Sequence, residues 1–229
     1  MTKYPNKTKN HTIYLTSIGK QVVGASTIAK MRAEDEKISM LMNWASKLSK
    51  LGIDHKKYTA YTGELGTLAH YLIQCHLEKK EPDTKNYSID LLNDAMIPFN
   101  AFLAWVKDKD IEPILMEKSF TSDNYFFGGT IDCYCKLGGK LTLLDFKTGS
   151  GIREEYWRQL AGYNLLLREN GYKVDQLTIL RLDREGNTEE KSVSFSTINK
   201  YETIFIKLCE IYQIENGLEF DKYKTRGDK

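Results

Sequence analysis

The sequence lacks a long apolar run. Hydrophobic residues make up 41% of the 229 positions, but no stretch approaches the roughly 18 consecutive apolar residues of a membrane-spanning helix. Residues 1–7 do not contain the apolar core of a secretory signal. We therefore expect an intracellular, cytoplasmic protein with no membrane partner.

The sequence also has little net charge. Its 33 basic and 31 acidic side chains leave a formal charge of +2, so any binding to nucleic acid has to depend on local basic clusters. Both ends of the chain carry such a cluster, which is also typical of a solvated tail. The residues are Lys3, Lys7 and Lys9 at one end and Lys222, Lys224, Arg226 and Lys229 at the other.

Cysteine is scarce and scattered. The four residues are Cys75, Cys133, Cys135 and Cys209, with no Cys-x-x-Cys pair and no nearby group of histidines to complete a metal site. This spacing argues against a zinc or iron–sulfur centre. Cys133 and Cys135 fall on one face of an expected strand, where small core residues are common.

The periodicity of the apolar residues predicts an α/β sandwich with a mixed sheet. An antiparallel meander of three strands is followed by a helical crossover to a further strand, the order helix, three strands, helix, strand. Helices are expected at 34–51, 61–79, 89–108 (kinked or restarted by Pro98), 153–170 and 197–215, and strands at 113–120, 125–137, 140–148, 175–182 and 190–195.

The absence of repeats and long linkers predicts a single domain overall. We divide it into an N-terminal helical elaboration at 1–60, a core at 61–215 and a basic C-terminal tail at 216–229.

Two of the expected strands carry acidic side chains inside apolar sequence. Asp132 ends the segment Gly128-Gly-Thr-Ile-Asp132, and Asp145 and Lys147 lie in the next strand. A buried charge is costly unless it is paired or binds a metal. Strand alternation places Asp145 and Lys147 on one face, and it places Ile131 and Cys133 behind Asp132. Two carboxylates and one ammonium in this arrangement are typical of metal-assisted hydrolysis, although a buried Asp–Lys pair of purely structural importance has the same pattern.

The Asp-x-Lys triplet alone is not informative, because it occurs four times. Three copies lie in polar helical or loop sequence, where surface charge is expected, and only the fourth lies in an apolar strand. The four are Asp35-Glu-Lys37, Asp54-His-Lys56, Asp83-Thr-Lys85 and Asp145-Phe-Lys147. The context of the last copy therefore carries the prediction.

Three motifs in order resemble the PD-(D/E)XK nuclease superfamily, specifically its RecB-type branch. They are Gly128-Gly-Thr-Ile-Asp132, Asp145-Phe-Lys147-Thr148 and Gln159-x-x-x-Tyr163, and the resemblance covers roughly residues 61–182. It implies a restriction-endonuclease-like αβββαβ core. It also implies that Asp132 and Asp145 bind Mg²⁺ or Mn²⁺ and that Lys147 activates or positions the attacking water.

The expected ligand set suits a hard cation. Mg²⁺ prefers oxygen ligands and keeps several waters, so two carboxylates and one backbone carbonyl, here that of Phe146, suffice. Members of the branch with an iron–sulfur cluster hold it through one upstream and three C-terminal cysteines. Only Cys209 follows the strands in this chain, so we expect no cluster.

Two further residues are candidates for the metal centre. Gly66-Thr-Leu-Ala-His70 resembles a helical Gly-x-x-x-His pattern of RecB-type nucleases, whose histidine is a metal ligand or supports one; the alternative is an exposed helix histidine. The glycine one turn earlier is expected to clear space beside the imidazole. Glu117, in the first strand, matches a glutamate that such proteins often carry near the active site, as a supporting carboxylate or the ligand of a second metal. The alternative is a surface charge.

Gln159 and Tyr163 are four residues apart, so they share one face of the expected helix, and Tyr156 extends that row. The resemblance implies that this row orients the DNA strand or the lysine. Without it, the row is a polar stripe packed at the sheet edge. Arg153 and Arg158 flank the row and are candidates for phosphate contacts.

These features together predict a metal-dependent DNA nuclease, more an exonuclease than a site-specific endonuclease, that hydrolyses phosphodiester bonds with metal-activated water. The expected partner is DNA, as single strands or duplex ends. A Walker-type motif is missing, which favours a free-standing nuclease of bacterial or phage type. Three alternatives remain open: a catalytically silent nucleic-acid-binding member of the fold, a structure-specific endonuclease, and a metal-free α/β protein with buried ion pairs.

Overall fold

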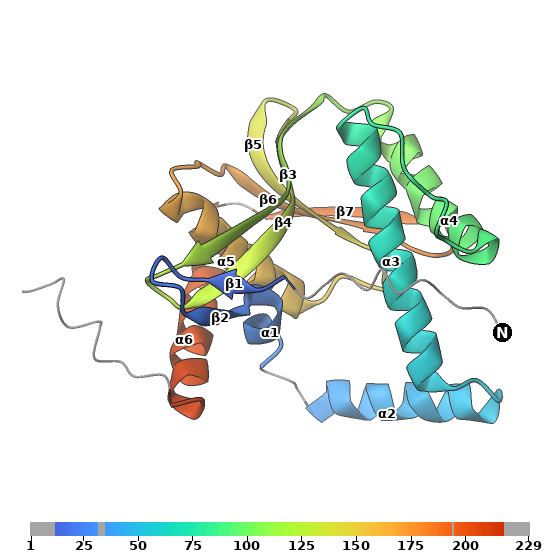
Figure 1. Cartoon of the computed structure of the whole chain (residues 1–229), viewed down its shortest axis with the longest axis horizontal. Helices are drawn as coiled ribbons and strands as arrows, with labels where there is room; N and C mark the ends of the chain where they lie inside the picture. Colours follow the sequence, from blue (N-terminus) through green and yellow to red (C-terminus); the bar gives the residue numbers. More distant parts are fainter. Residues whose placement is uncertain (1–11, 32–34, 194, 218–229) are drawn as a thin grey trace, which may run out of the picture.

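The computed structural model describes residues 12–31, 35–193 and 195–217. Within these ranges helices and strands follow the order shown in Figure 1. The helices are α1 (Ala25–Ala29), α2 (Asp35–Lys50), α3 (His55–Leu77), α4 (Ile89–Val106), α5 (Glu154–Glu169) and α6 (Phe195–Glu215). The strands are β1 (Tyr14–Leu15), β2 (Gln21–Gly24), β3 (Ile111–Ser122), β4 (Phe127–Leu137), β5 (Lys140–Lys147), β6 (Gln176–Leu182) and β7 (Thr188–Val193).

The sheet is mixed, as the sequence predicts. β3, β4 and β5 form an antiparallel meander. Helix α5 then crosses over to β6, which pairs with β5 in parallel, and β7 pairs with β6 antiparallel. The order from α4 to β6 is the predicted αβββαβ order, so the α/β fold class is confirmed.

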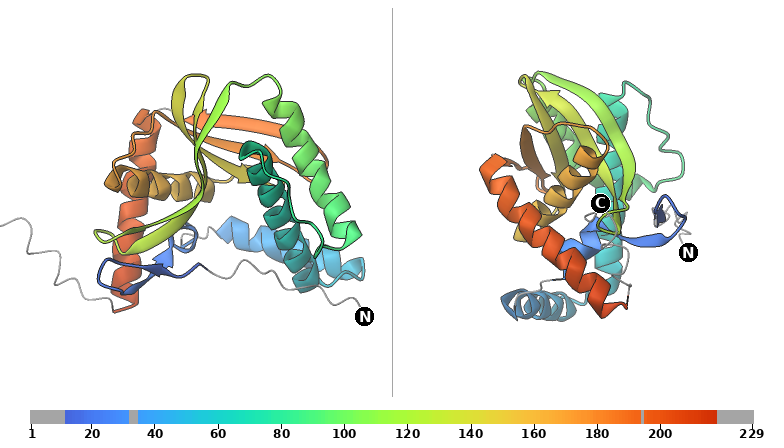
Figure 2. Two further views of the ribbon diagram at one scale, coloured as in Figure 1. Left: turned by 45° about the horizontal axis from the view of Figure 1, so that its top comes forward. Right: turned by 90° about the vertical axis from the view of Figure 1, so that its left-hand side faces the viewer.

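Helices cover both faces of the sheet, and each face has its own apolar core (Figures 1 and 2). One core joins the sheet to α1, α5 and α6, for example through Ile28, Leu160 and Phe205. The other joins it to α3 and α4 through Ile73 and Phe102. A smaller cluster packs α3 against α4. Burial on both sides explains why β4 and β5 are so apolar.

The N-terminal segment differs from its prediction. Residues 1–60 were expected to be helical, but this segment also contributes β1 and β2, and β2 pairs in parallel with β4. Strands of two and four residues are too short to show a period of two in the sequence. The domain boundaries themselves stay a prediction. Residues 1–11 and 218–229, which contain both basic clusters, lie outside the described residues.

Two helices also differ in detail. α3 begins at His55, not near residue 61, because the Asp54 carboxylate caps it by accepting the amides of Lys56 and Lys57. α4 continues through Pro98 without a restart, and Pro98 is buried. In α2, which extends beside the first turns of α3 (Figure 2), several apolar side chains are exposed. Among the described helices, none is long and apolar enough to cross a membrane.

Candidate metal centre

The candidate site lies where β5 separates from β4. One edge of β4 pairs with β3 along its length, whereas the other edge pairs with β2 at Phe127 and Gly128 and with β5 only from Cys133 onward. The backbones of β4 and β5 no longer pair beyond Cys133–Leu144. There the Asp132 carboxylate accepts the backbone amide of Phe146 at 2.9 Å. A side chain therefore replaces the next rung of the ladder.

The alternation of side chains along β4 is broken at the same position. Ile131 and Tyr134 both pack in the α5–α6 core, whereas Cys133 and Cys135 pack in the α3–α4 core. The prediction that Ile131 and Cys133 share a face is therefore wrong. A strict period of two holds only for regular strands, and β4 is irregular at Asp132.

β5 keeps its alternation. Leu144 and Phe146 are buried in the α3–α4 core. The side chains of Asp145 and Lys147 lie together, with Lys147 Nζ 2.6 Å from Asp145 Oδ2. The predicted pairing of this carboxylate and this ammonium is present in the structure.

Three side chains from three elements bring donor atoms to one point. His70 from α3, Glu117 from β3 and Asp132 from β4 each offer a ligand atom, and these atoms lie within 4.8 Å of one another. Glu117 has a φ of 45°, which is unfavourable for a residue with a Cβ. The tertiary structure maintains this strained backbone at the position of a clustered carboxylate, an arrangement that is common at functional sites.

Asp132 is strongly stabilised as a carboxylate. Burial alone would raise its pKa, but His70, Lys147 and the Phe146 amide hold the pKa of Asp132 well below its usual value. His70 Nδ1 lies 3.5 Å from Asp132 Oδ2, and the imidazole packs edge-on against the Phe146 ring. His70 is thus oriented toward the acidic cluster and away from bulk solvent.

Asp145 has the opposite shift. It is 1% exposed, and burial raises the pKa of Asp145 to about 6, although Lys147 opposes the change. The Asp145 carboxylate is attracted by the Lys147 ammonium, 2.6 Å from its Oδ2, and also by His70. For Lys147, burial lowers the pKa, but the attraction of Asp145 and Asp132 outweighs it and raises the pKa overall.

These residues fit a divalent cation. The cluster offers two carboxylates and an imidazole within one short span, and the buried Asp145 carboxylate interacts electrostatically with Asp132 and His70 of that cluster. Asp145 is not one of the three clustered groups. The ligand roles of Asp145 and of the Phe146 carbonyl stay predictions.

The row on α5 packs against this centre. Gln159 Nε2 donates to the Tyr163 hydroxyl at 2.6 Å, and the Lys147 ammonium lies 4.9 Å from the centre of the Tyr156 ring. Tyr163 is buried, and burial together with Asp132 and Asp145 raises its pKa well above the usual value. Tyr163 therefore stays a neutral hydroxyl beside the acidic groups.

The two arginines of this helix have different surroundings. Arg158 is 7% exposed, and its Nε donates to the backbone carbonyl of Ala29 at 3.0 Å. The predicted phosphate contact of Arg158 is therefore corrected to a link between α5 and α1. Arg153 is half-exposed and lies 3.9 Å from Glu155, which leaves it accessible.

The adjacent glycines of β4 have distinct neighbours. A Cβ on Gly128 would lie 2.2 Å from the Tyr14 ring, and a Cβ on Gly129 would lie 2.5 Å from the Tyr163 ring. The Tyr14 hydroxyl is within hydrogen-bond distance of Thr130 Oγ1. Tyr14 is not identifiable from the sequence, because the two residues of β1 carry no detectable pattern.

The neighbour of Gly66 also differs from the one predicted. A Cβ on Gly66 would lie 2.9 Å from Thr148 Oγ1. The space is taken by the segment after β5 and not by the imidazole of His70. The glycine thus allows α3 to approach the Asp145–Lys147 segment closely.

No family model matches the chain, and no curated protein does. Solved structures with a similar chain path include a candidate exonuclease from Eubacterium rectale, with 11% identity, a TM-score of 0.44 and coverage of 72% of this chain and 76% of that one. They also include the alkaline exonuclease LHK-Exo from Laribacter hongkongensis; its complex with dAMP has 13% identity, a TM-score of 0.42 and coverage of 89% and 92%. Likeness at this level assigns no activity to this chain.

Proposed function

We propose that this protein is a metal-dependent DNA nuclease of the RecB-type branch. The observation that carries the proposal is the convergence of His70, Glu117 and Asp132 beside the buried pair of Asp145 and Lys147. Five side chains from four elements are held at the point where two strands separate. The ordered sequence motifs support the same assignment independently.

His70, Glu117 and Asp132 would hold Mg²⁺ or Mn²⁺, with Asp145 next to them. A divalent cation held there would supply positive charge for a scissile phosphate and would lower the pKa of a bound water. Lys147 remains an ammonium because two carboxylates attract it, so it can orient a nucleophilic water or stabilise developing negative charge. Tyr156 limits the positions that this ammonium can take.

The proposal is tested by incubating end-labelled linear DNA and closed circular DNA with the purified protein and Mg²⁺ or Mn²⁺. Linear DNA should shorten while circles survive, because the resemblance favours an exonuclease. EDTA should stop the reaction. Cutting of circles would instead identify an endonuclease, and the absence of turnover with either metal would reject a nuclease.

Matched variants separate the site from nonspecific charge effects. Asp145→Asn and Lys147→Ala should each lower kcat by at least about a hundredfold, a typical cost of removing a catalytic electrostatic group. Lys85→Ala removes the lysine of another Asp-x-Lys triplet, which is exposed, and should leave the rate unchanged. Full activity in Asp145→Asn or Lys147→Ala would contradict the assignment.

A further inference from the structure

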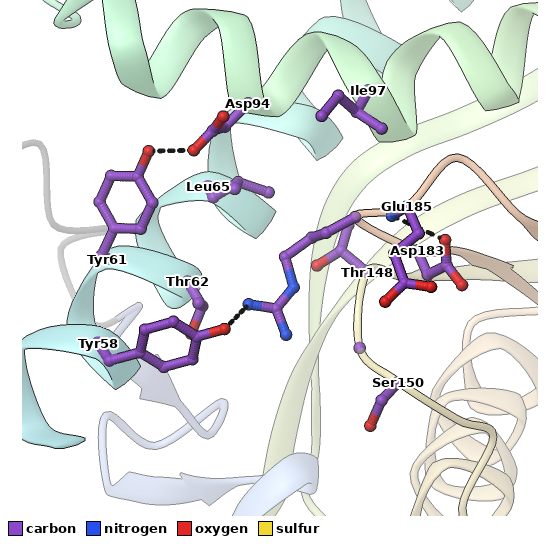
Figure 3. Close-up of a pocket in the computed structure, with 12 residues that line it drawn as sticks. Tyr58, Tyr61, Thr62, Leu65, Asp94, Ile97, Thr148, Ser150, Asp183 and Glu185 are labelled. Atoms are coloured by element: carbon purple, nitrogen blue, oxygen red, sulfur yellow. Dashed lines mark hydrogen bonds between the residues drawn. The ribbon is translucent and has the colours of Figure 1, made fainter. Parts of the chain in front are cut away.

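A cavity of about 380 Å³ lies between α3, α4 and the segment that follows β5 (Figure 3). It does not include the acidic cluster itself. Thr148 lines it and directly follows Lys147, and Thr62 lines it from α3, about two helical turns before His70. The cavity therefore borders the end of β5 that carries Asp145 and Lys147.

Tyrosine rings and a guanidinium line this cavity. Tyr58 and Tyr61 enter from α3, and the segment after β5 faces them with Thr148 and Ser150 (Figure 3). Arg184, in the turn between β6 and β7, donates from Nη1 to the Tyr58 hydroxyl at 3.0 Å. This uses one of the five guanidinium donors and leaves others for a ligand.

Arg184 is the one cationic side chain among the residues that line the cavity, beside the carboxylates of Asp94, Asp183 and Glu185. Asp183 is held by Arg181 at 2.6 Å and by amides of its own turn. Asp94 accepts the Tyr61 hydroxyl at 2.5 Å. Among the carboxylates that the structure describes, none forms an ion pair with Arg184.

From this arrangement we infer that the cavity binds one nucleotide of the DNA strand, next to the nucleotide whose phosphodiester is cleaved. Arg184 contacts its phosphate, and the rings of Tyr58 and Tyr61 contact its base. This inference rests on the proposed nuclease function. Stacking on aromatic rings tolerates every base, which suits an enzyme that moves along a strand. A site lined by carboxylates is unsuited to several phosphates, so a single nucleotide is the expected occupant.

Binding is tested directly with deoxynucleoside 5′-monophosphates. Trp44 lies 6.0 Å from the Tyr58 ring, so ligand entry should change tryptophan fluorescence. Monophosphates should bind more tightly than deoxynucleosides and more tightly than inorganic phosphate. Arg184→Ala and Tyr58→Ala should each weaken binding by roughly tenfold, as expected for a lost phosphate contact or a lost stacking partner.

Lys191→Ala is the matched control, because it removes one positive charge from the exposed surface of β7. It should leave the Kd unchanged. Unchanged binding in both Arg184→Ala and Tyr58→Ala would overturn the inference. So would equal affinity for inorganic phosphate, or binding that Asp132→Asn abolishes but Arg184→Ala does not affect.

Kinetics on single-stranded DNA distinguish the cavity from the chemistry. Arg184→Ala should raise KM by roughly tenfold with kcat preserved, whereas Asp145→Asn lowers kcat. If the wild-type protein cleaves DNA and Arg184→Ala has an unchanged KM, the cavity inference fails and the nuclease proposal stands. If the protein cleaves no DNA yet binds nucleotides through Arg184, the nuclease proposal fails instead.

Discussion

The carboxylate of Asp132 accepts the backbone amide of Phe146 where β4 and β5 part. This bond ties the first acidic motif to the second, because Phe146 lies between Asp145 and Lys147. It satisfies an amide that the separated strands leave without its usual partner. Glu117 lies across from Asp132 in the β3–β4 ladder, between the pairs Met116–Cys133 and Lys118–Ile131. His70 reaches the same carboxylate from α3.

Glu117 provides a test of strain at the site. Its φ of 45° favours glycine, so Glu117→Gly should be more stable to urea than Glu117→Ala by about 1 kcal/mol. At the exposed strand residue Glu112 the order should reverse, because glycine weakens an ordinary strand. Both Glu117 variants should lose the rise in Tm that Mn²⁺ causes in the wild type. A full Mn²⁺ response in either variant would exclude Glu117 as a ligand.

Gly129 should not tolerate a side chain. Its Cβ would meet the buried ring of Tyr163, and Gly129→Ala should lower the free energy of unfolding by about 1–3 kcal/mol. Tyr163→Ala removes the obstructing ring, so the double variant should be more stable than the sum of the two single changes predicts. Strict additivity in urea unfolding would argue against this contact.

Arg158 should matter for stability and not for DNA binding. Arg158→Ala removes the donor to the Ala29 carbonyl and should cost about 2 kcal/mol, a typical value for a buried bond from a charged group. Arg153→Ala, at a half-exposed position, should change stability by less than about 0.5 kcal/mol. Urea unfolding and DNA affinity measured on both variants distinguish the two positions; a loss of affinity in Arg158→Ala without a loss of stability would restore the original prediction.

Asp183 should make the free energy of unfolding depend on pH in the acidic range. Burial would raise its pKa, but hydrogen bonds from Asn187, from the Arg181 guanidinium and from the backbone amide of Glu185 lower the pKa of Asp183 from 3.8 to about 2. Its stabilisation is therefore complete above the unfolded value and is lost as the pH falls from about 4 toward 2. Asp183→Asn should be less stable than the wild type at pH 6, with a difference that narrows below pH 4. A constant difference in urea unfolding between pH 6 and pH 3 would contradict this.

The sequence alone determined the order of elements from α2 to α6, the α/β class and the shared face of Asp145 and Lys147. These follow from local patterns: apolar periodicity sets a helix or strand, and alternation along β5 sets the face of each side chain. Such patterns fail where a strand is short or irregular. β1 and β2 were therefore missed, and the faces of Ile131 and Cys133 were assigned wrongly.

Only the tertiary structure decided which residues meet. The pairing of β3 with β4 and the position of α3 bring Glu117 and His70 to Asp132, and packing turns Arg158 inward to α1. Tyr14 and Arg184 reach the region of the site from distant segments, through contacts that no local pattern encodes. The types of residue in a site follow from sequence, whereas their convergence depends on long-range packing of elements that are far apart along the chain.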